Sequence, residues 1–427
     1  MSHRVVITGV GLLTPLGRGA DEFWPNLLAG HSGIGPITLF DARSLPARIG
    51  GEVKDFDAAR VRREFPGVVT EKDRKIWLGL DATAQAVTDS GLPATAFARA
   101  SLYVGVSLET FHLEDVAAVA HATDLTAALA AHLRSQGAGL QLQTPLDRVA
   151  TLLSARYGLR GGRFVNCSAC AAGAQAIGEA FRRLRDGGGE VALAGATDSI
   201  LNPLGLGGFS LLQILSAEND RPTQACRPFD ATRQGTVLAE GAAFLVLETE
   251  PHARQRGARI YAEIAGYASS LDAFRVSDPE PSGRGATRSM ARAIADAGRT
   301  PMEIDGINAH GTGTPKNDVA ETLAIKQVFG ERAYRIPVTA NKSMTGHMIA
   351  ASGAVEAAAS ALTLQTGKIP PTINLATPDP QCDLDYTAGR ARDFSGATML
   401  SNSFGFGGQN ASLVFRRYPA CTITNNS

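Results

Sequence analysis

Strand-like and helix-like segments alternate along most of the 427-residue chain, and this rhythm occurs twice. In chain order, the segments expected as strands or helices are 4–8, 71–90, 101–106, 112–135, 163–167, 171–185, 190–195, 242–248, 260–266, 305–310, 318–329, 336–340, 346–365 and 398–416. Such alternation predicts an α/β protein with helices packed on a sheet. In each half, a strand is followed by a reactive residue and then by a helix rich in Ala and Gly, once around Cys170 and once around His347. This recurrence suggests a duplication.

The chain opens on RVVITGVG, a β-rich run followed by Gly9 and Gly11. A nucleotide-binding fingerprint would need a third glycine that is out of place here, and no helical pattern follows at once. We therefore expect a tight turn at a sheet edge.

Composition excludes several classes of protein. Lys and Arg number 41, as do Asp and Glu, which argues against a dedicated nucleic-acid binder. No uncharged apolar run reaches about 18 residues, so no membrane span is expected. The N-terminal run does not match a signal peptide, and five cysteines in a long chain fit a reducing compartment, so we expect a cytoplasmic protein.

Cys170 lies between the strand candidate 163–167 and a helical pattern of small residues. A cysteine at a helix N-terminus is expected to have a lowered pKa, which favours a nucleophile. A buried structural cysteine is the alternative. Cys167 completes a CxxC motif, but no second CxxC or nearby His pair supports a zinc site, so no metal is expected.

His310 (in NAHGTGT) and His347 (in NKSMTGH) each follow an apolar run and precede Gly. Strand ends followed by Gly-rich turns commonly hold active groups in α/β proteins. Lys342 lies close to His347 in sequence. Glu321 has two interpretations, because Asp318 and Glu321 also match a capping box for a helix over 318–329.

Residues 402–410, NSFGFGGQN, form a Gly-rich loop with two aromatic residues. Backbone N–H groups in such a loop can bind an oxyanion. The loop lacks the Lys-Ser/Thr pair of a phosphate-binding loop, which argues against a nucleotide.

The ordered motifs SACAAG, LSAEND, NAHGTGTPKND and NKSMTGH resemble those of the β-ketoacyl-acyl carrier protein synthases with a Cys-His-His site, over nearly the whole chain. The resemblance implies a thiolase-like fold of five αβαβα layers built from two similar halves, residues 1–255 and 256–427. It implies a homodimer or a heterodimer with a ketosynthase-like subunit, acting with an acyl carrier protein. It implies no cofactor of the chain's own, since 4'-phosphopantetheine is carried by the partner.

The resemblance also assigns roles to residues. Cys170 would take an acyl chain from a carrier thioester, and His310 and His347 would stabilise the enolate that forms when a malonyl thioester loses CO2. Lys342 and Glu321 would form a charged pair that orients the histidines, the backbone N–H groups of Cys170 and Phe404 would form an oxyanion hole, and Phe404 would also act as a gate. Thr312 and Thr314 would bind phosphopantetheine, and the acyl pocket would be lined by Leu108, Phe209 and Phe404. Carrier-protein docking is implied for Arg74 and Lys75, with Arg60, Arg62 and Arg63 as further candidates.

Several positions depart from the family pattern: Leu108, Glu109 and Thr110 replace a Gly-rich run, 141–159 differs throughout, Gln234 interrupts a basic-acidic signature, and Glu71 and Gln213 replace basic residues. We therefore expect a ketosynthase of a dedicated fatty-acid or polyketide-type pathway rather than the housekeeping elongation enzyme. An acyltransferase that does not decarboxylate, or a subunit of a ketosynthase and chain-length-factor heterodimer, is the further alternative. The chain-length-factor type usually lacks the nucleophile, which this chain keeps.

Overall fold

The computed structural model describes residues 2–68, 71–109, 113–135 and 144–419. Its strands are β1 (Val5–Thr14), β2 (Gly17–Arg18), β3 (Ile34–Pro36), β4 (Ile49–Gly51), β5 (Ser101–Gly105), β6 (Arg163–Asn166), β7 (Val191–Asp198), β8 (Gly241–Thr249), β9 (Ala262–Leu271), β10 (Gly306–Asn308), β11 (Val338–Thr339), β12 (Lys368–Ile369), β13 (Arg392–Asp393), β14 (Thr398–Gly405) and β15 (Gln409–Arg416). Its α-helices are α1 (Gly19–Leu28), α2 (Ala58–Glu64), α3 (Arg74–Ser90), α4 (Leu113–Ala117), α5 (Leu125–Ser135), α6 (Arg148–Tyr157), α7 (Ala172–Arg185), α8 (Pro203–Leu211), α9 (Glu250–Gln255), α10 (Arg284–Asp296), α11 (Pro315–Phe329), α12 (Lys342–Thr345) and α13 (Ser352–Thr366). Thr110 and residues 141–143, named above as departures, lie outside the described residues.

Ten strands form two sets with the same pairing pattern. The order β6-β5-β7-β8-β1 has two parallel pairs followed by two antiparallel pairs, and β11-β10-β14-β15-β9 repeats it. The sets join where Val5–Ile7 pairs with Ala262–Ile264. Two halves of one topology, as expected from the recurring sequence pattern, thus build the sheet framework.

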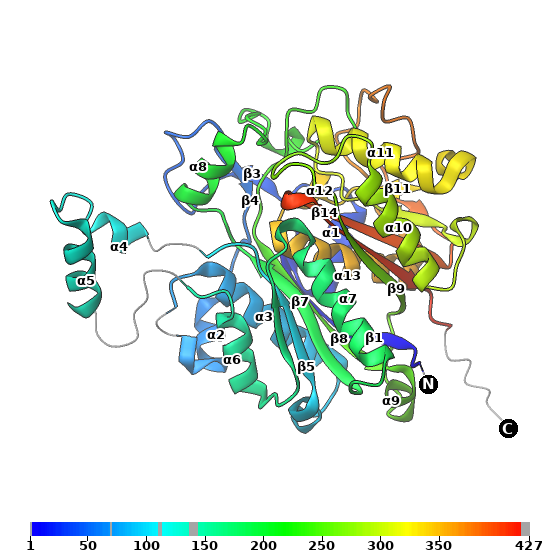
Figure 1. The fold of residues 1–427 in the computed structure, drawn as a ribbon, viewed down its shortest axis with the longest axis horizontal. Coiled ribbons are helices and arrows are strands. Elements are labelled where there is room, and N and C mark those ends of the chain that lie inside the picture. The colour runs from blue at the N-terminus through cyan, green and yellow to red at the C-terminus, as the bar shows by residue number, and fades with distance from the viewer. Residues whose placement is uncertain (1, 69–70, 110–112, 136–143, 420–427) are drawn as a thin grey trace.

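Helices divide the molecule into five layers (Figure 1). The helices α7 and α13 lie between the two strand sets and contact each other, α7 on β5 and β7 and α13 on β14. The helix α3 covers the outer face of β1 and β8, and α10 covers β9 and β15. This is the thiolase-like αβαβα arrangement.

The first strand differs from the expectation of a turn at a sheet edge. β1 continues through Gly9 and Gly11 and lies between β8 and β9. The two glycines allow α3 to approach the strand closely. A Cβ atom on Gly11 would lie 1.8 Å from the carbonyl oxygen of Ala82 in α3, and one on Gly9 would lie 2.3 Å from that of Ala86. The glycines therefore serve helix packing rather than a turn.

The central helices need small residues for the same reason. A Cβ atom on Gly173 would lie 2.6 Å from the carbonyl oxygen of Ala350, and one on Gly178 would overlap the ring of Tyr267. Every described side chain of α13 from Ser352 to Leu364 is buried. The Ala- and Gly-rich segments that follow Cys170 and His347 thus bring the two halves together at the centre, where both residues lie.

No helix among the described residues is long and apolar enough to span a membrane.

Candidate active site

Cys170 lies in a single 3₁₀ turn (Ala169–Ala171) that joins β6 to α7. Its side chain is buried, and its Sγ lies 3.2 Å from Nε2 of His347. Ala169 has a left-handed backbone (φ 49°), which turns the chain sharply before the helix. A Cβ atom on Gly405 would lie 3.1 Å from the backbone N of Cys170, so the Gly-rich loop 402–410 packs directly on the turn.

The expected lowering of the Cys170 pKa is wrong for the protein without substrate. Burial raises the pKa of the Cys170 thiol to about 11, while the charge of Lys342 acts in the opposite direction. Desolvation of the thiolate therefore outweighs the helix N-terminus, and the resting sulfur is a thiol at neutral pH.

The hydrogen bonds of His347 fix which ring nitrogen carries the proton. Its Nδ1 accepts the backbone N–H of Ile349 at 3.2 Å and faces the hydroxyl of Ser352 at 3.0 Å. Because Nδ1 accepts the N–H of Ile349 and so carries no proton, the Ser352 hydroxyl donates to the ring, while its oxygen accepts the N–H of Met348. Nδ1 is thus the acceptor, and the proton of the neutral imidazole is on Nε2, facing Cys170.

His310 has the same tautomer by a different route. The Nζ of Lys342 lies 3.3 Å from Nδ1 of His310 and donates to the His310 carbonyl oxygen at 2.7 Å. An ammonium only donates, so Nδ1 accepts and Nε2 carries the proton. The rings of His310 and His347 meet edge to face with centroids 5.4 Å apart. Burial lowers the pKa of both imidazoles well below the usual value, and the charge of Lys342 adds to this, so both rings are neutral donors.

The ion-pair partner of Lys342 is Glu356, not Glu321 as expected. The Lys342 Nζ lies 2.5 Å from the Glu356 carboxylate, and both side chains are buried. Burial raises the pKa of Glu356 to about 7 against the lowering effect of Lys342. Sequence reasoning missed Glu356, although this residue ends the motif NKSMTGH--AASGAVE, 14 residues after Lys342, and lies in α13.

Glu321 positions His310 by its backbone. Its carboxylate accepts the N–H groups of His310 and Gly311, both at 2.8 Å. The capping box expected at Asp318 is wrong, because α11 begins at Pro315 and Asp318 instead accepts the N–H groups of Gly313 and Phe229.

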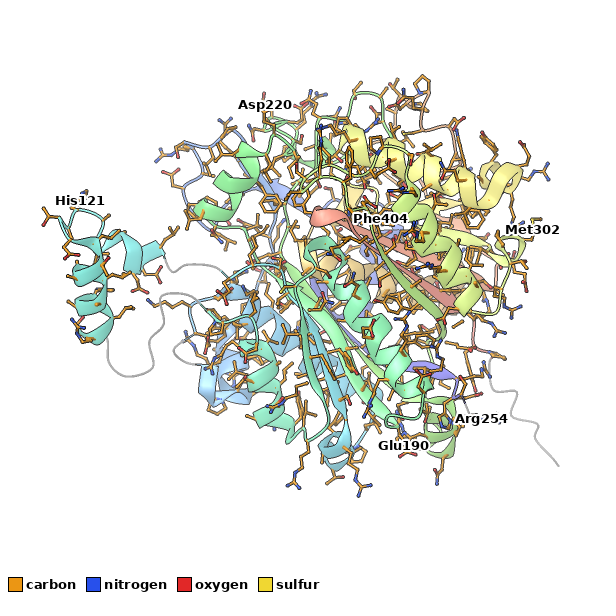
Figure 2. The ribbon with its side chains drawn as sticks, in the orientation of Figure 1. His121, Glu190, Asp220, Arg254, Met302 and Phe404 are labelled. Carbon is orange, nitrogen blue, oxygen red and sulfur yellow. The ribbon has the colours of Figure 1, made fainter. Side chains whose placement is uncertain are left out.

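An oxyanion hole and a gate were expected at Phe404, but the residue of this loop whose backbone N–H acts on the Cys170 thiol is Phe406, two residues further on. The backbone N–H groups of Phe406 and Cys170 act on the Cys170 thiol, and both lower its pKa against the effect of burial. Phe404 is buried, its ring packs on His310 with centroids 5.9 Å apart, and it lines the cavity above Cys170, as expected of an acyl-pocket residue. Figure 2 shows it in the interior of the molecule. Strand β14 is buried from Thr398 to Phe404, and Phe406 comes after the strand has ended, between Gly405 and Gly407.

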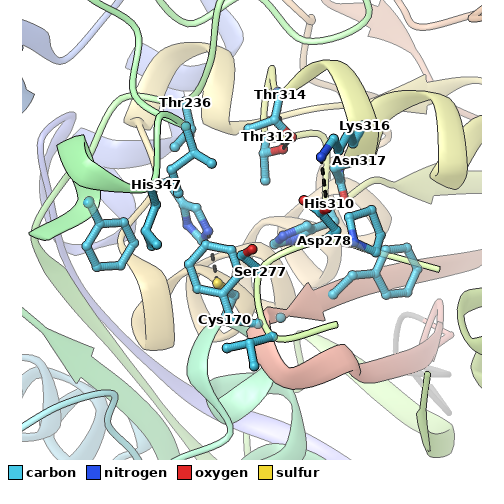
Figure 3. A pocket seen from close by; sticks show the side chains of 18 of the residues that line it. Cys170, Thr236, Ser277, Asp278, His310, Thr312, Thr314, Lys316, Asn317 and His347 are labelled. Atoms are coloured by element: carbon cyan, nitrogen blue, oxygen red, sulfur yellow. Dashed lines mark hydrogen bonds and ion pairs between the residues drawn. The ribbon is translucent and has the colours of Figure 1, made fainter. Parts of the chain in front are cut away.

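A cavity of about 300 Å³ opens above Cys170 and contains both histidines (Figure 3). Thr312 and Thr314 line one wall, with their hydroxyl oxygens 2.9 Å apart. Phe209 and Phe406 line the apolar side, with ring centroids 5.9 Å apart.

Leu108, expected in the acyl pocket, does not line this cavity. Its side chain is half exposed, and its carbonyl oxygen accepts a hydrogen bond from the ammonium of Lys75. Its neighbour Glu109 is also outside the cavity lining. The two residues follow the end of β5, and their segment does not contribute to the lining of the cavity.

The docking role expected for Lys75 is wrong because its side chain is buried, whereas Arg74 is partly exposed and paired with a buried carboxylate. Lys75 is buried and pairs with Asp73 at 2.9 Å, and Arg74 pairs with the buried carboxylate of Glu240 at 2.7 Å. Of the further candidates, Arg60 pairs with buried Asp81, while Arg62 and Arg63 are exposed on α2. Arg74 and Lys75 are directed inward because they lie at the start of α3, which packs on the sheet.

Cys170, His310 and His347 present ligand atoms that all lie within 4.8 Å of one another, and this is the one such group found among the described residues. A thiophilic cation placed there would occupy the nucleophile and both imidazoles. The donor set fits a metal by type, but both Nε2 atoms carry protons in the hydrogen-bonding pattern above.

We expect alkylation of Cys170 by iodoacetamide to accelerate about tenfold per pH unit between pH 7 and 9, because the reactive thiolate fraction rises in that way below a raised pKa. The rate can be followed by peptide mass spectrometry at Cys170, with exposed Cys167 in the same digest as an internal reference. A rate that is constant from pH 6 to 8 would instead mean a thiolate-imidazolium pair with His347.

Comparisons with known proteins agree with this geometry. Family models for the N-terminal and C-terminal domains of beta-ketoacyl synthase match residues 2–253 and 261–376. The 3-oxoacyl-[acyl-carrier-protein] synthase 2 of Synechocystis sp. is 42% identical over 418 residues, covering 97% of this chain and 98% of that protein. Two solved structures, each 32% identical with a TM-score of 0.84 and covering 98% of this chain and 100% of the other, are a type II PKS ketosynthase in complex with its acyl-carrier protein and the ishigamide ketosynthase/chain length factor.

A thiolase-like fold around a Cys-His-His cluster is that of a condensing acyltransferase. The chain belongs to the β-ketoacyl synthase family.

Proposed function

We propose that the chain is a β-ketoacyl-acyl carrier protein synthase that joins an acyl group held on Cys170 to a malonyl unit, with loss of CO2. One observation carries the proposal: two neutral imidazoles with protonated Nε2 atoms and two backbone N–H groups surround a single buried sulfur. Acyl transfer alone does not need two such imidazoles. Their position suits an enolate, whose oxygen is the charge that forms as CO2 leaves.

In the first step, the Cys170 sulfur forms a bond to the acyl carbonyl carbon, and the carrier thiol leaves with the proton. We assign stabilisation of the charge on the carbonyl oxygen to the backbone N–H groups of Cys170 and Phe406, which both act on the Cys170 thiol. The proton of the Cys170 thiol passes to the departing carrier sulfur, and the Nε2–H of His347, 3.2 Å from the Cys170 sulfur, stabilises the negative charge that develops there.

In the second step, the malonyl thioester loses CO2, and the electron pair of the broken C–C bond moves into the enolate. The Nε2–H groups of His310 and His347 donate to the enolate oxygen. The enolate carbon then attacks the acyl-Cys170, and the sulfur leaves and takes up one proton. The products are CO2 and a 3-ketoacyl thioester that is two carbons longer. The chain's own residues suffice for these steps, and 4'-phosphopantetheine arrives on the carrier protein.

The proposed partners are an acyl carrier protein and a second ketosynthase-fold subunit, identical or related. Among the described residues, strand β6 ends the sheet with one unpaired edge, and Phe164 on it is half exposed and stacked on Tyr103. An exposed apolar strand edge is suited to pairing with another chain, and sedimentation at the mass of one chain would contradict this. The described cysteines are free thiols, which supports a cytoplasmic location.

The test is a condensation assay with malonyl carrier protein and a panel of acyl primers, with mass spectrometry of the products and detection of labelled CO2. We expect 3-ketoacyl products with a restricted range of primer lengths. Acyl-enzyme without CO2 release would indicate a simple acyltransferase and contradict the proposal. Equal rates with the cognate carrier protein and the fatty-acid carrier protein would contradict the dedicated pathway but not the chemistry.

A further inference from the structure

Of the cations expected to receive the carrier protein, Lys75 is buried, and Arg74 and Arg60 are paired with buried carboxylates. This raises the question of which cations lie at the mouth of the cavity. Among the residues that line the cavity, the cation at the mouth is Lys316, whose side chain is 67% exposed. Lys342, the other lysine of the site, is buried beneath His310. A charged group that enters the cavity from solvent therefore passes Lys316 first.

The segment 310–316 runs from the floor of the cavity to its mouth. His310 and Thr312 are buried, Thr314 is partly exposed and Lys316 is exposed, and all four line the same cavity. Figure 3 shows Thr312, Thr314 and Lys316 on the same side of the cavity as His310. A thioester that reaches Cys170 would lie along this wall, and the far end of its arm would lie near Lys316.

Asp278 holds Lys316 in place across the mouth. The Lys316 Nζ lies 2.8 Å from the Asp278 carboxylate, and the same carboxylate oxygen lies 3.3 Å from the Arg275 guanidinium, whose side chain is 66% exposed. Two cations thus share one carboxylate. An exposed ion pair adds little to stability, so the pair need not be a structural device.

The loop that carries Arg275 and Asp278 is tied to the loop at the floor of the site. The N–H of Gly407 donates to the carbonyl oxygen of Val276 at 2.7 Å, and the N–H of Asp272 donates to the carbonyl oxygen of Gly408 at 2.9 Å. These bonds place the two cations at a fixed position beside the mouth. They do so without using either cation in the core.

We propose that Lys316, with Arg275, binds the phosphodiester of the phosphopantetheine arm, and that Asp278 occupies the cations until the phosphate replaces it. The inference rests on the proposed function, since it takes a phosphopantetheine thioester as the substrate. A phosphate oxygen accepts charge-assisted hydrogen bonds from an ammonium and a guanidinium as a carboxylate does. The hydroxyls of Thr312 and Thr314 lie between this position and the histidines, where the amide-containing part of the arm would pass.

The test compares two soluble malonyl thioesters, one of pantetheine and one of phosphopantetheine, which differ only in the phosphate. The measured quantity is the ratio of kcat/KM for CO2 release with phosphopantetheine to that with pantetheine. We expect Lys316→Ala to lower this ratio about tenfold, Lys316→Arg to keep most of it, and Asp278→Asn to raise it about threefold, because the competing carboxylate charge is removed.

The matched control is Lys326→Ala, on the same helix but paired with Asp383 and outside the cavity lining. It removes the same charge from the chain and should leave the ratio unchanged. A ratio that is unchanged in Lys316→Ala, or that falls equally in Lys326→Ala, overturns the inference. Failure of the proposed function is distinguishable, because then the unaltered protein releases no CO2 from either thioester.

Discussion

Cys170→Ala should abolish acyl-enzyme formation and reduce condensation by at least about a thousandfold, since no other nucleophile replaces the sulfur. Release of CO2 from malonyl carrier protein should continue, because the Nε2–H groups of His310 and His347 act on the enolate without the thiol. The measurements are intact-protein mass after incubation with an acyl carrier protein thioester, condensation product, and labelled CO2.

The control is Cys167→Ala, which removes the exposed thiol three residues earlier. It should keep both the acyl adduct and condensation. An acyl adduct on the Cys170→Ala protein would show that the acyl group is carried elsewhere and would contradict the proposed chemistry. Loss of CO2 release together with condensation would instead mean that the thiol takes part in decarboxylation.

Much of the fold follows from local sequence patterns. The alternation of strands and helices and the small-residue helices after Cys170 and His347 predict two similar halves, and the pairing pattern of the two strand sets repeats. The opening strand was predicted too short, because Gly9 and Gly11 were given a local role. Their reason lies in α3, more than 60 residues away, whose backbone would collide with any Cβ atom there.

The site shows the same division between local and long-range information. Motifs around single residues place Cys170, His310, His347, Thr312 and Thr314 in one cavity. The predictions that fail are those that depend on which side chains contact one another in the folded protein. A lysine that a motif assigns to the surface can instead form a buried ion pair, as Lys75 does with Asp73. The sequence pattern does not show that this end of α3 is buried.

Pairing of charges was the least predictable feature. Glu321 and Glu356 are both buried glutamates near the histidines, and both have a pKa raised by burial to about 7. Only the packing of α13 against the strand ends decides that Glu356 meets Lys342, while Glu321 meets backbone N–H groups. A spacing rule along the chain cannot distinguish these two geometries.

That buried charge pair gives the second large effect, in Lys342→Met. The change removes the donor to His310 Nδ1 and leaves the Glu356 carboxyl buried without its cation. We expect a loss of about 3–5 kcal/mol in unfolding free energy. We also expect CO2 release to fall about a hundredfold, because the proton of His310 is no longer held on Nε2.

The pH dependence of Lys342→Met has a definite sign. Lys342 lowers the pKa of Glu356, so its removal raises that pKa further above the value of about 7 in the intact protein. The folded variant then keeps a proton that the unfolded chain releases, and its stability falls as pH rises from 6 to 8. Urea unfolding of the variant at both pH values, set against the unaltered protein, measures this.

Two further measurements separate positioning of His310 from a general loss of structure. Lys368→Met removes an exposed ion pair with Asp393 and should cost no more than about 1 kcal/mol. In the folded fraction of Lys342→Met, acylation of Cys170 should continue while CO2 release falls, since His347 and the N–H groups of Cys170 and Phe406 are unchanged. If acylation and CO2 release fall by the same factor, Lys342 acts only through the stability of the fold and not through the His310 tautomer.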